Sequence, residues 1–263
     1  IGHYIGTLSG LPAANQPIVY GELPLSISGG NGTFPLKLMA KTQPNGRVVS
    51  ISGTTIYTLG VGNVTVIGII NNQTTTSTFK IVPRPLTVTA HNFSRNYGTS
   101  NPIFTSSVLG LVNGDAVAVA YFTLASSVSG IGIYVIIPSV TGSSLINYEL
   151  ITDTGTLLVK PSPLNISVGN AYKVYGAENP SFSSTIAGLV NADTLHIEYQ
   201  TSASPISSSG IYPITISIAG VAISNYNVSI AGGSMYISKA LLTVVAFNQV
   251  KYASEYPFAP FLY

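Results

Sequence analysis

The stretch NYGTSNP at residues 96–102, followed by GLVNGD at 110–115, recurs as VYGAENP at 174–180 and GLVNAD at 188–193. Both words return at the same offset, so that Tyr97 corresponds to Tyr175 and Asp115 to Asp193. When residues 85–160 are laid on residues 163–238 without a gap, 28 of the 76 pairs are identical. A fixed period of this length is the signature of tandem structural repeats. The sequence therefore predicts two copies of one domain.

The residues that the two copies share suit structural roles. Tyr97 and Tyr175 can bury their rings while the hydroxyl finds a backbone partner. Gly98 and Gly176 suit turns with positive φ, and the Asn-Pro pairs mark a break before the next strand. Asp115 and Asp193, the only repeated carboxylates, are interpreted as turn or helix-cap residues. The structural repeat positions are Tyr97, Gly98, Asn101, Pro102, Asp115, Tyr134, Asn147 and Tyr148, and then Tyr175, Gly176, Asn179, Pro180, Asp193, Tyr212, Asn225 and Tyr226.

Short runs of β-branched and aromatic residues predict an all-β fold. LTVTA at 86–90, LNISV at 164–168 and YPITISIA at 212–219 are bounded by Gly, Pro, Asn and Ser. Apolar and small polar residues alternate within them, which is typical of strands with one buried face. No stretch keeps a helical period, so at most one short helical turn is expected in each domain, after Asp115 or Asp193. We expect tandem, small sandwich-like domains.

The repeat also sets the expected domain bounds. IVYGELP at 18–24 carries the same opening, and LLTVVAFNQVKYASEYPF from Leu241 begins a third copy. Only Pro161 and Ser162 separate the strand expected at 156–160 from the next one, which restricts bending and favours an elongated array. We read the chain as a piece of something longer. The expected divisions are a preceding module or linker at 1–14, a related β domain at 15–82, repeats at 83–160 and 161–239, and the truncated start of a further repeat at 240–263.

Composition excludes several classes of function. Only 7% of the residues are charged, and ten scattered Lys and Arg give a net charge of +2, which argues against nucleic-acid binding. The chain has no cysteine, hence no disulfide and no thiol nucleophile. No apolar run reaches the roughly 18 residues that a membrane span needs. The expected partners are neighbouring domains of the same chain, with surface glycans or proteins as a further option.

The sequence offers no repeated chemical site. One repeated carboxylate in each copy cannot form the acid and base pair of a glycosidase, and no run of acidic residues resembles a calcium loop. His3, His91 and His196 have no counterparts in the other copy and no second histidine at metal-ligand spacing. No serine lies in a nucleophile motif. We predict no catalytic, cofactor-binding or metal-binding residues, and no enzyme activity.

These motifs closely resemble the MBG ("mostly beta, glycine-rich") domain family. The resemblance lies in Tyr97-Gly98, Asn101-Pro102, GLVNGD at 110–115, Asn147-Tyr148 and their counterparts in the second copy. It covers 85–160 and 163–239 and the start of a third copy, which departs at Ala253 and Tyr256. Residues 15–82 look more like a bacterial Ig-like module with an MBG-type opening. The family occurs as tandem modules in large bacterial surface and secreted proteins and has no known catalytic residues.

Three hypotheses follow for the function. The first, which the resemblance favours, is a structural stalk or spacer in an adhesin-like protein, extracellular or at the bacterial cell surface. The second is a carbohydrate-binding or protein-binding adhesion module that uses strand edges or loops. An enzyme, the third, would need a pocket that brings a histidine together with at least two of the acids that are not repeated.

Overall fold

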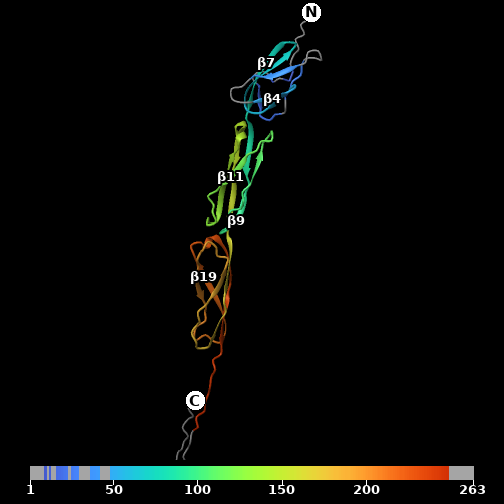
Figure 1. The fold of residues 1–263 in the computed structure, drawn as a ribbon. Coiled ribbons are helices and arrows are strands. Elements are labelled where there is room, and N and C mark those ends of the chain that lie inside the picture. Colours follow the sequence, from blue (N-terminus) through green and yellow to red (C-terminus); the bar gives the residue numbers. More distant parts are fainter. Residues whose placement is uncertain are drawn as a thin grey trace, which may run out of the picture. The chain divides into compact units, whose positions relative to one another are not determined.

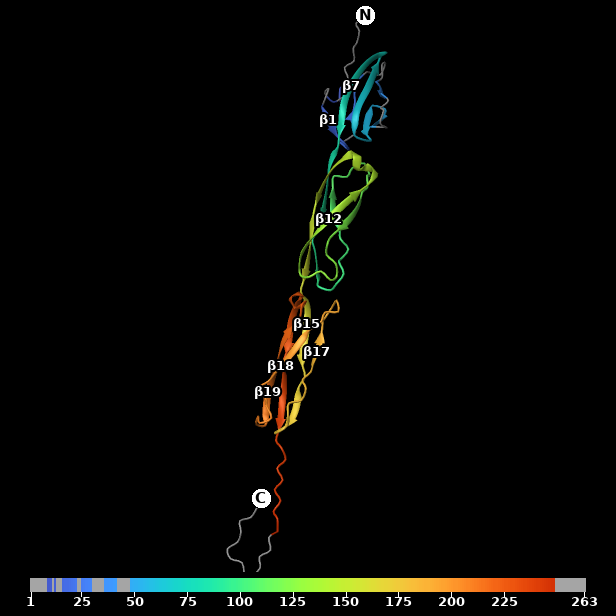
Figure 2. The same ribbon diagram turned by 90° about the vertical axis from the view of Figure 1, so that its left-hand side faces the viewer.

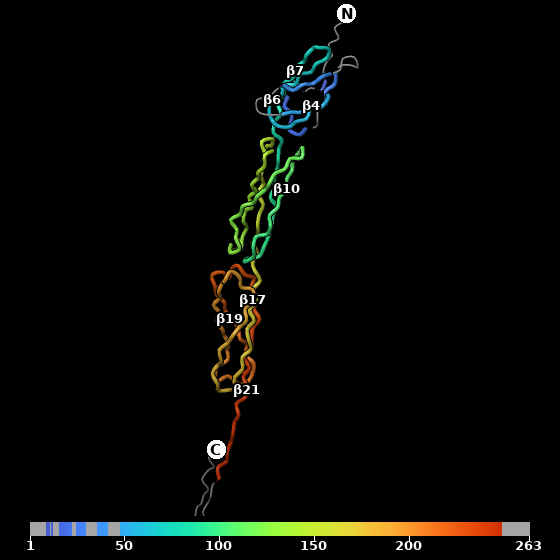
Figure 3. Tube along the Cα trace, viewed as in Figure 1, coloured from blue at the N-terminus to red at the C-terminus, as the bar shows by residue number. Residues whose placement is uncertain are grey.

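The computed structural model describes residues 9–10, 12, 16–22, 25–29, 36–41 and 48–248. The chain divides into two compact units. The first contains the described residues up to Val159 except 96–98, and the second contains Asn96–Gly98 and the described residues from Lys160 onward. Figure 1 shows the strands of both units and Figure 3 follows their Cα trace.

The N-terminal module, residues 16–82, has two sheets. Its four-stranded sheet has the order β1-β7-β6-β3, and its three-stranded sheet has the order β2-β5-β4. β1 runs parallel to the last strand, β7, with Val19 opposite Val82. The strands are β1 (Pro17–Val19), β2 (Leu25–Ser26), β3 (Lys37–Ala40), β4 (Val49–Ser52), β5 (Thr55–Thr58), β6 (Gly62–Ile70) and β7 (Gln73–Val82).

The first repeat, residues 83–160, also has a three-stranded and a four-stranded sheet, with the orders β10-β8-β13 and β11-β12-β14-β9. A 3₁₀ turn, η1 (Ser143–Asn147), precedes β13. The strands are β8 (Arg84–Ala90), β9 (Phe93–Asn96), β10 (Ser106–Leu109), β11 (Ala118–Phe122), β12 (Gly132–Thr141), β13 (Tyr148–Asp153) and β14 (Gly155–Lys160).

The second repeat, residues 161–239, has the same topology strand for strand. Its sheets have the orders β17-β15-β20 and β16-β21-β19-β18, and the two layers are visible in Figure 2. A 3₁₀ turn, η2 (Ile223–Asn225), precedes β20. The strands are β15 (Ser162–Val168), β16 (Ala171–Val174), β17 (Ser184–Ala187), β18 (His196–Gln200), β19 (Gly210–Ala219), β20 (Tyr226–Ala231) and β21 (Gly233–Ser238).

Two chain segments cross from one sheet to the other within each repeat. In the second repeat β15 continues into β16, and β20 continues into β21. The crossing segments pair in parallel in both sheets, β15 with β20 in one and β16 with β21 in the other. The chain therefore enters the repeat at the start of β15 and leaves it at the opposite end, after β21.

Alternation of side chains explains these strands. Along β15, Leu164 and Ile166 point into the core and are fully buried, whereas Asn165 and Ser167 point outward. Leu86 and Val88 do the same along β8. Each buried aliphatic side chain of this size contributes roughly 1.5–3 kcal/mol relative to an exposed one. The period-two pattern thus fixes which face of each strand is buried.

The all-β fold with only short helical turns is confirmed, but two details of the prediction are wrong. The helical turns precede β13 and β20, and no helix follows Asp115 or Asp193, where the chain leads into β11 and β18. LLTVVA at 241–246, whose β-branched residues also predict a strand, forms none. The equivalent strands β8 and β15 are each paired on both sides, and no such partners exist for 241–248 in the described part of the chain.

Other predictions fall outside the described residues. They concern His3 and most of the module at 1–14, Pro24 in the upstream opening, and Ala253 and Tyr256 in the third copy.

Candidate functional site

The repeated aspartate of the first repeat holds two tyrosine hydroxyls. Tyr148 donates a hydrogen bond to Asp115 Oδ2 at 2.7 Å, and Tyr20 of the N-terminal module donates to the same oxygen at 3.0 Å. The two rings meet edge to face, with centroids 5.5 Å apart and an interplanar angle of 85°. This is the favoured geometry for an aromatic pair. We call Tyr20, Gly21, Val112, Asp115 and Tyr148 the first Tyr–Asp joint.

Close packing completes this joint. Gly21 has φ of 73°, and a Cβ there would overlap the side chain of Val112. The glycine is therefore needed both for its backbone conformation and for the approach of the valine. Two further contacts link the N-terminal module with the first repeat. Asn113 Nδ2 donates to Thr58 O at 3.4 Å, and Val61 N donates to Asn147 Oδ1 at 3.1 Å.

The joint disfavours ionised tyrosine. Burial, and then the hydrogen bond to the carboxylate of Asp115, raises the pKa of Tyr148 to about 12. Burial also raises the pKa of Tyr20. Because a phenolate would lie against a carboxylate with little water, both hydroxyls stay protonated and keep donating. Hydrogen bonds to a charged acceptor are stronger than those between neutral groups.

The second repeat carries an equivalent ring pair and one tyrosine hydroxyl on its aspartate. Tyr226 donates to Asp193 Oδ2 at 2.6 Å, and burial raises its pKa. Tyr97 lies in the first repeat by sequence but in the second compact unit, where its ring meets Tyr226 at 5.5 Å and 85°. A Cβ on Gly98, whose φ is 80°, would overlap the side chain of Val190. We call Tyr97, Gly98, Val190, Asp193 and Tyr226 the second Tyr–Asp joint.

A tight turn positions each aspartate next to the tyrosine hydroxyl that it binds. The amide of Asp115 donates to Val112 O at 2.9 Å, and that of Asp193 donates to Val190 O at 3.0 Å. Both central residues of each turn are left-handed, Asn113 and Gly114 in the first and Asn191 and Ala192 in the second. Asn and Gly accept this conformation readily, which explains the sequence LVNGD. Each turn ends at the aspartate, directly before the segment for which a helical turn is predicted.

A tyrosine amide also fastens the parallel strand to the end of each domain. Tyr20 N donates to Val82 O at 3.0 Å, Tyr97 N to Lys160 O at 2.8 Å, and Tyr175 N to Ser238 O at 2.9 Å. In all three cases the acceptor is the last residue of the domain's last strand, and Val82 and Lys160 lie directly before the next domain. The Tyr-Gly of the sequence motif is therefore placed at the C-terminal end of its domain.

The remaining repeated residues fix loops. Asn101 Nδ2 donates to Ala125 O and Asn179 Nδ2 to Ala203 O, both at 2.7 Å. The hydroxyl of Tyr134 donates to Gly130 O at 2.9 Å, and that of Tyr212 to Ser208 O at 3.0 Å. Pro102 and Pro180 follow these asparagines outside any strand, and Asn225 ends η2.

A buried cation, which sequence reasoning missed, supports the same loops. Arg95 Nε donates to Asn101 Oδ1 at 2.8 Å, and its Nη2 donates to Ser126 O. Lys173 takes the place of Arg95 and donates to Ala177 O at 3.1 Å and Ser204 O at 2.7 Å. Asn179 Oδ1 is buried and has no hydrogen-bond partner. The available signal was a basic residue at the same position of both copies.

The structure therefore unites some predicted residues and separates others. It brings Tyr97, Gly98, Asp193 and Tyr226 together in one unit, and Asp115 with Tyr148 in the other. The expected buried ring is wrong for Tyr175, which is 49% exposed. No domain covers it within the described part of the chain. Sequence reasoning missed the carboxylates that accept from the hydroxyls of Tyr20, Tyr148 and Tyr226.

The polar contacts of His91 and His196 are made with residues outside these joints. His91 Nδ1 is 2.9 Å from Thr105 Oγ1, and His196 Nε2 is 3.4 Å from Glu198 Oε1, with both of the latter side chains exposed. A surface cavity of about 620 Å³ is lined by His196 and a single acid, Asp193. Across residues 48–248 and the shorter described segments, no three His, Asp or Glu side chains form a group that could hold a metal ion.

The family model of the MBG domain (YGX type) matches residues 86–158 and 164–236, more than half of the chain. The chain belongs to the MBG domain family. The YGX of its description corresponds to Tyr97-Gly98-Thr99 and Tyr175-Gly176-Ala177, the segments that fasten the end of each MBG repeat. No curated protein matches the chain. No helix in the described ranges is long and apolar enough to cross a membrane.

Several solved structures are similar to the chain at low identity. The I-band fragment I67-I69 from titin is 9% identical with a TM-score of 0.32, over 90% of this chain and 99% of that one. Drosophila N-cadherin EC1-3 is 9% identical with a TM-score of 0.25, over 88% and 100%. A Bacteroides ovatus glucan-utilization protein, SGBP-B, in complex with a mixed-linkage heptasaccharide, is 12% identical with a TM-score of 0.23, over 97% and 77%. These likenesses carry no functional conclusion.

Proposed function

We propose that the chain is a non-catalytic structural segment of a bacterial extracellular or cell-surface protein, in which MBG repeats serve as spacers. The observation that carries the proposal is the first Tyr–Asp joint. In this joint the most strictly repeated motifs of the sequence, Tyr-Gly, Leu-Val-Asn and the lone Asp, connect the N-terminal module to the first repeat. A repeated motif that served catalysis or metal binding would instead place several acidic residues or histidines close together.

The joint has the properties of a stiff connection. It combines an aromatic pair worth about 0.5–1.5 kcal/mol with two hydrogen bonds to a charged acceptor at about 1.5–3 kcal/mol each. A single residue, Pro83, separates β7 from β8, and Pro161 alone separates β14 from β15. Proline fixes its own φ and restricts the residue before it. A short, proline-containing connection beside a packed joint favours a spacer that resists bending.

The test measures stiffness and shape directly. The cysteine-free chain accepts spin labels at Thr75→Cys in β7 and Ala120→Cys in β11, both exposed positions of the first unit. A narrow distance distribution is expected, with clear broadening in Asp115→Ala and none in the matched Asp153→Ala. Small-angle scattering of the unlabelled chain should show an extended particle. A compact particle, or a broad distribution in the parent chain, would contradict the spacer function.

One surface favours a second candidate, adhesion to a glycan or protein. The rings of Tyr172 and Tyr236 stack at 5.1 Å with an interplanar angle of 13°, and the exposed Ile211 lies opposite Tyr236 on β19. Exposed apolar and aromatic groups gathered in one place mark interaction sites. The first repeat has Ser94 and Leu158 at the equivalent positions.

A glycan array and a pull-down from neighbouring-cell surfaces test the adhesion candidate. Binding should be lost in Tyr172→Ser, which copies the first repeat. The adhesion candidate would be ruled out if the parent chain bound nothing in either assay, or if Tyr172→Ser bound as well as the parent chain.

A further inference from the structure

Within the described part of the chain, the C-terminal end of the second repeat has the backbone of a Tyr–Asp joint without the covering residues. Tyr175 is held by its amide to Ser238 O at 2.9 Å, in the same way as Tyr20 and Tyr97 are held in their domains. The exposed fractions of these three residues differ sharply, at 3% for Tyr20, 4% for Tyr97 and 49% for Tyr175. The backbone hydrogen bond of the joint is thus present at Tyr175, whereas the Tyr175 side chain is exposed.

Gly176 shows the same contrast. Its φ of 88° matches that of Gly98, at 80°, and of Gly21, at 73°. A Cβ on Gly21 or Gly98 would overlap a valine, whereas a Cβ on Gly176 would meet no atom within 4 Å. The space that Val112 and Val190 fill in the two occupied joints is therefore vacant of protein at Gly176, among the described residues.

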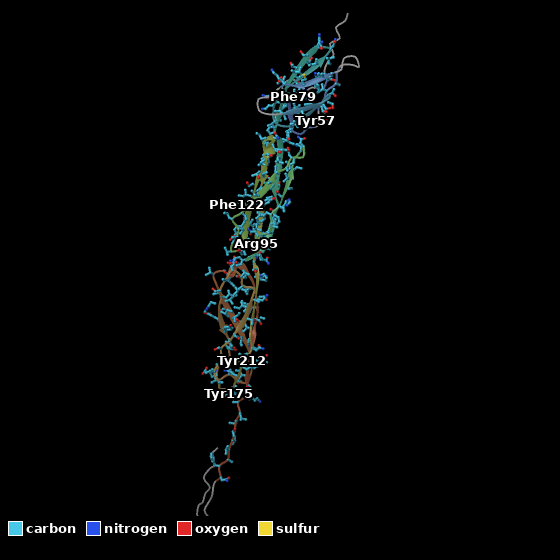
Figure 4. The ribbon with its side chains drawn as sticks, viewed as in Figure 1. Tyr57, Phe79, Arg95, Phe122, Tyr175 and Tyr212 are labelled. Atoms are coloured by element: carbon cyan, nitrogen blue, oxygen red, sulfur yellow. The ribbon has the colours of Figure 1, made fainter. Side chains whose placement is uncertain are left out.

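A cavity marks this end of the repeat. It has a volume of about 500 Å³ and is lined by Tyr175, Ser208, Ser209 and residues 239–242. Figure 4 shows Tyr175 and Tyr212 at the same end of the second repeat, where the chain leaves β21. The lining combines an aromatic ring, two serine hydroxyls, one lysine and the apolar side chains of Ala240, Leu241 and Leu242, so it suits an apolar group beside an acid.

The segment that follows identifies the occupant. Leu242 corresponds to Leu86 and Leu164, which are both fully buried, yet Leu242 is 85% exposed. Val244 corresponds to Val88 and Ile166 and is exposed as well. Residues 241–248 thus carry the core-facing pattern of a first strand without the rest of a domain around it. An MBG repeat built on this strand would bring its own valine, aspartate and tyrosine to Tyr175.

We propose that the face formed by Tyr175, Gly176 and Lys239 is a docking surface for a third MBG repeat whose first strand is 241–248. The incoming repeat places a valine against Gly176, an aspartate on the Tyr175 hydroxyl and a tyrosine edge-on to the Tyr175 ring. This inference rests on the proposed function, because it takes the occupied joints to be the working connection between repeats.

The test compares the full chain with an extended chain in which residues 241–263 are replaced by a copy of residues 163–239. Both are treated with tetranitromethane, and nitration of Tyr97 and Tyr175 is followed by peptide mass spectrometry. In the full chain Tyr175 should react at least tenfold faster than Tyr97. In the extended chain Tyr175 should slow to the rate of Tyr97. Asp193→Ala confined to the added copy should restore fast nitration of Tyr175.

A second variant separates docking from backbone strain. Gly176→Ala carries the same strain in both chains, so any larger loss of Tm in the extended chain reports the clash with the incoming valine. Equal losses, or unchanged nitration of Tyr175 while Tyr97 stays protected, would overturn the docking surface alone. Fast nitration of Tyr97 would overturn the joint itself and with it the proposed function. Protection of Tyr175 that grows with the concentration of the unextended chain would assign the face to a second copy, against this proposal.

Discussion

The hydroxyl of Tyr148 lies 2.7 Å from Asp115 Oδ2 and also accepts a hydrogen bond from the amide of Val112 at 3.1 Å. The same two bonds join Tyr226 to Asp193 and Val190, at 2.6 Å and 3.1 Å. The tyrosine that begins β13 or β20 therefore ties the Leu-Val-Asn-x-Asp turn to the sheet behind it. This contact lies inside each repeat, and in the first repeat it presents the carboxylate to Tyr20 of the preceding module.

Replacing the aspartate should weaken the first unit. In Asp115→Ala the hydroxyls of Tyr20 and Tyr148 both lose their acceptor, and we expect unfolding to become easier by about 2 kcal/mol. Urea unfolding monitored by tyrosine fluorescence measures the change. Asp153→Ala is the control, because Asp153 Oδ2 accepts only from the exposed hydroxyl of Thr89 at 3.0 Å. A loss for Asp115→Ala no larger than the control's roughly 0.5 kcal/mol would contradict a structural role for this carboxylate.

The glycines of the YGX motif should differ in their tolerance of a methyl group. Gly98→Ala adds a clash with Val190 to the strain of a positive φ, and should cost about 3 kcal/mol. Gly176→Ala carries the strain alone and should cost about 1 kcal/mol in the full chain. Thermal unfolding of the two variants makes the comparison. Val190→Ala combined with Gly98→Ala should recover part of the loss, and an additive result would mean that the two side chains do not meet.

An arginine at position 173 should stabilise the second repeat. Asn179 Oδ1 is buried without a partner, whereas Asn101 Oδ1 receives Arg95 Nε at 2.8 Å. Lys173→Arg supplies the missing donor and should raise the free energy of unfolding by about 1 kcal/mol. The reverse change, Arg95→Lys, should lower that of the first repeat by a similar amount. Chemical unfolding checks both signs, and a destabilised Lys173→Arg would show that the Asn179 carbonyl is not accessible to the guanidinium.

Alkaline pH should loosen the first joint. Tyr148 has a pKa of about 12 in the folded chain, above the ordinary value of 10.0. Above pH 10 the unfolded chain loses this proton while the folded chain retains it, so stability is complete below pH 10 and declines toward pH 12. The decline approaches about 1.4 kcal/mol per pH unit for one tyrosine. Urea unfolding from pH 9 to 12 measures the slope. Tyr148→Phe should be less stable at pH 9, but its free energy of unfolding should fall less steeply with pH. An unchanged pH dependence would contradict the raised pKa of Tyr148.

Much of the fold could be read from the sequence because its signals are local. Alternation along 86–90 and 164–168 identifies β8 and β15, and the constant offset between the two copies predicts a shared topology. The turn at Asp115 was harder to predict, because DAVAV suits a helix as well as a strand. The left-handed pair Asn113 and Gly114 decides the outcome by closing a tight turn before a helix can begin.

The joint itself could not be predicted from local pattern. Tyr20 and Asp115 are far apart in the sequence, and their contact depends on how two domains meet. The sequence does contain a signal, the Tyr-Gly pair at 20–21. Its offset from Tyr97-Gly98 is one position shorter than the offset from Pro24 to Pro102, so an ungapped alignment on the prolines does not match the tyrosines. The pairing of Arg95 with Asn101 is likewise not evident from the sequence, because scattered basic residues indicate only a weak net charge. For residues 241–248 the local pattern predicts a strand that the structure lacks. A strand-forming sequence stays unpaired when no neighbouring strands are present.

The parallel pairing of β16 with β21 has a mechanical consequence. The chain enters the second repeat through β15 and β16 and leaves it through β21, so tension on the two ends draws β16 and β21 in opposite directions. Their hydrogen bonds, with Ala171 opposite Met235 through Val174 opposite Ser238, lie across the pull and share the load together. An antiparallel hairpin pulled from its open end would lose its bonds one at a time. The Tyr175 amide adds one more bond at the exit, where a pulled strand would first begin to slip.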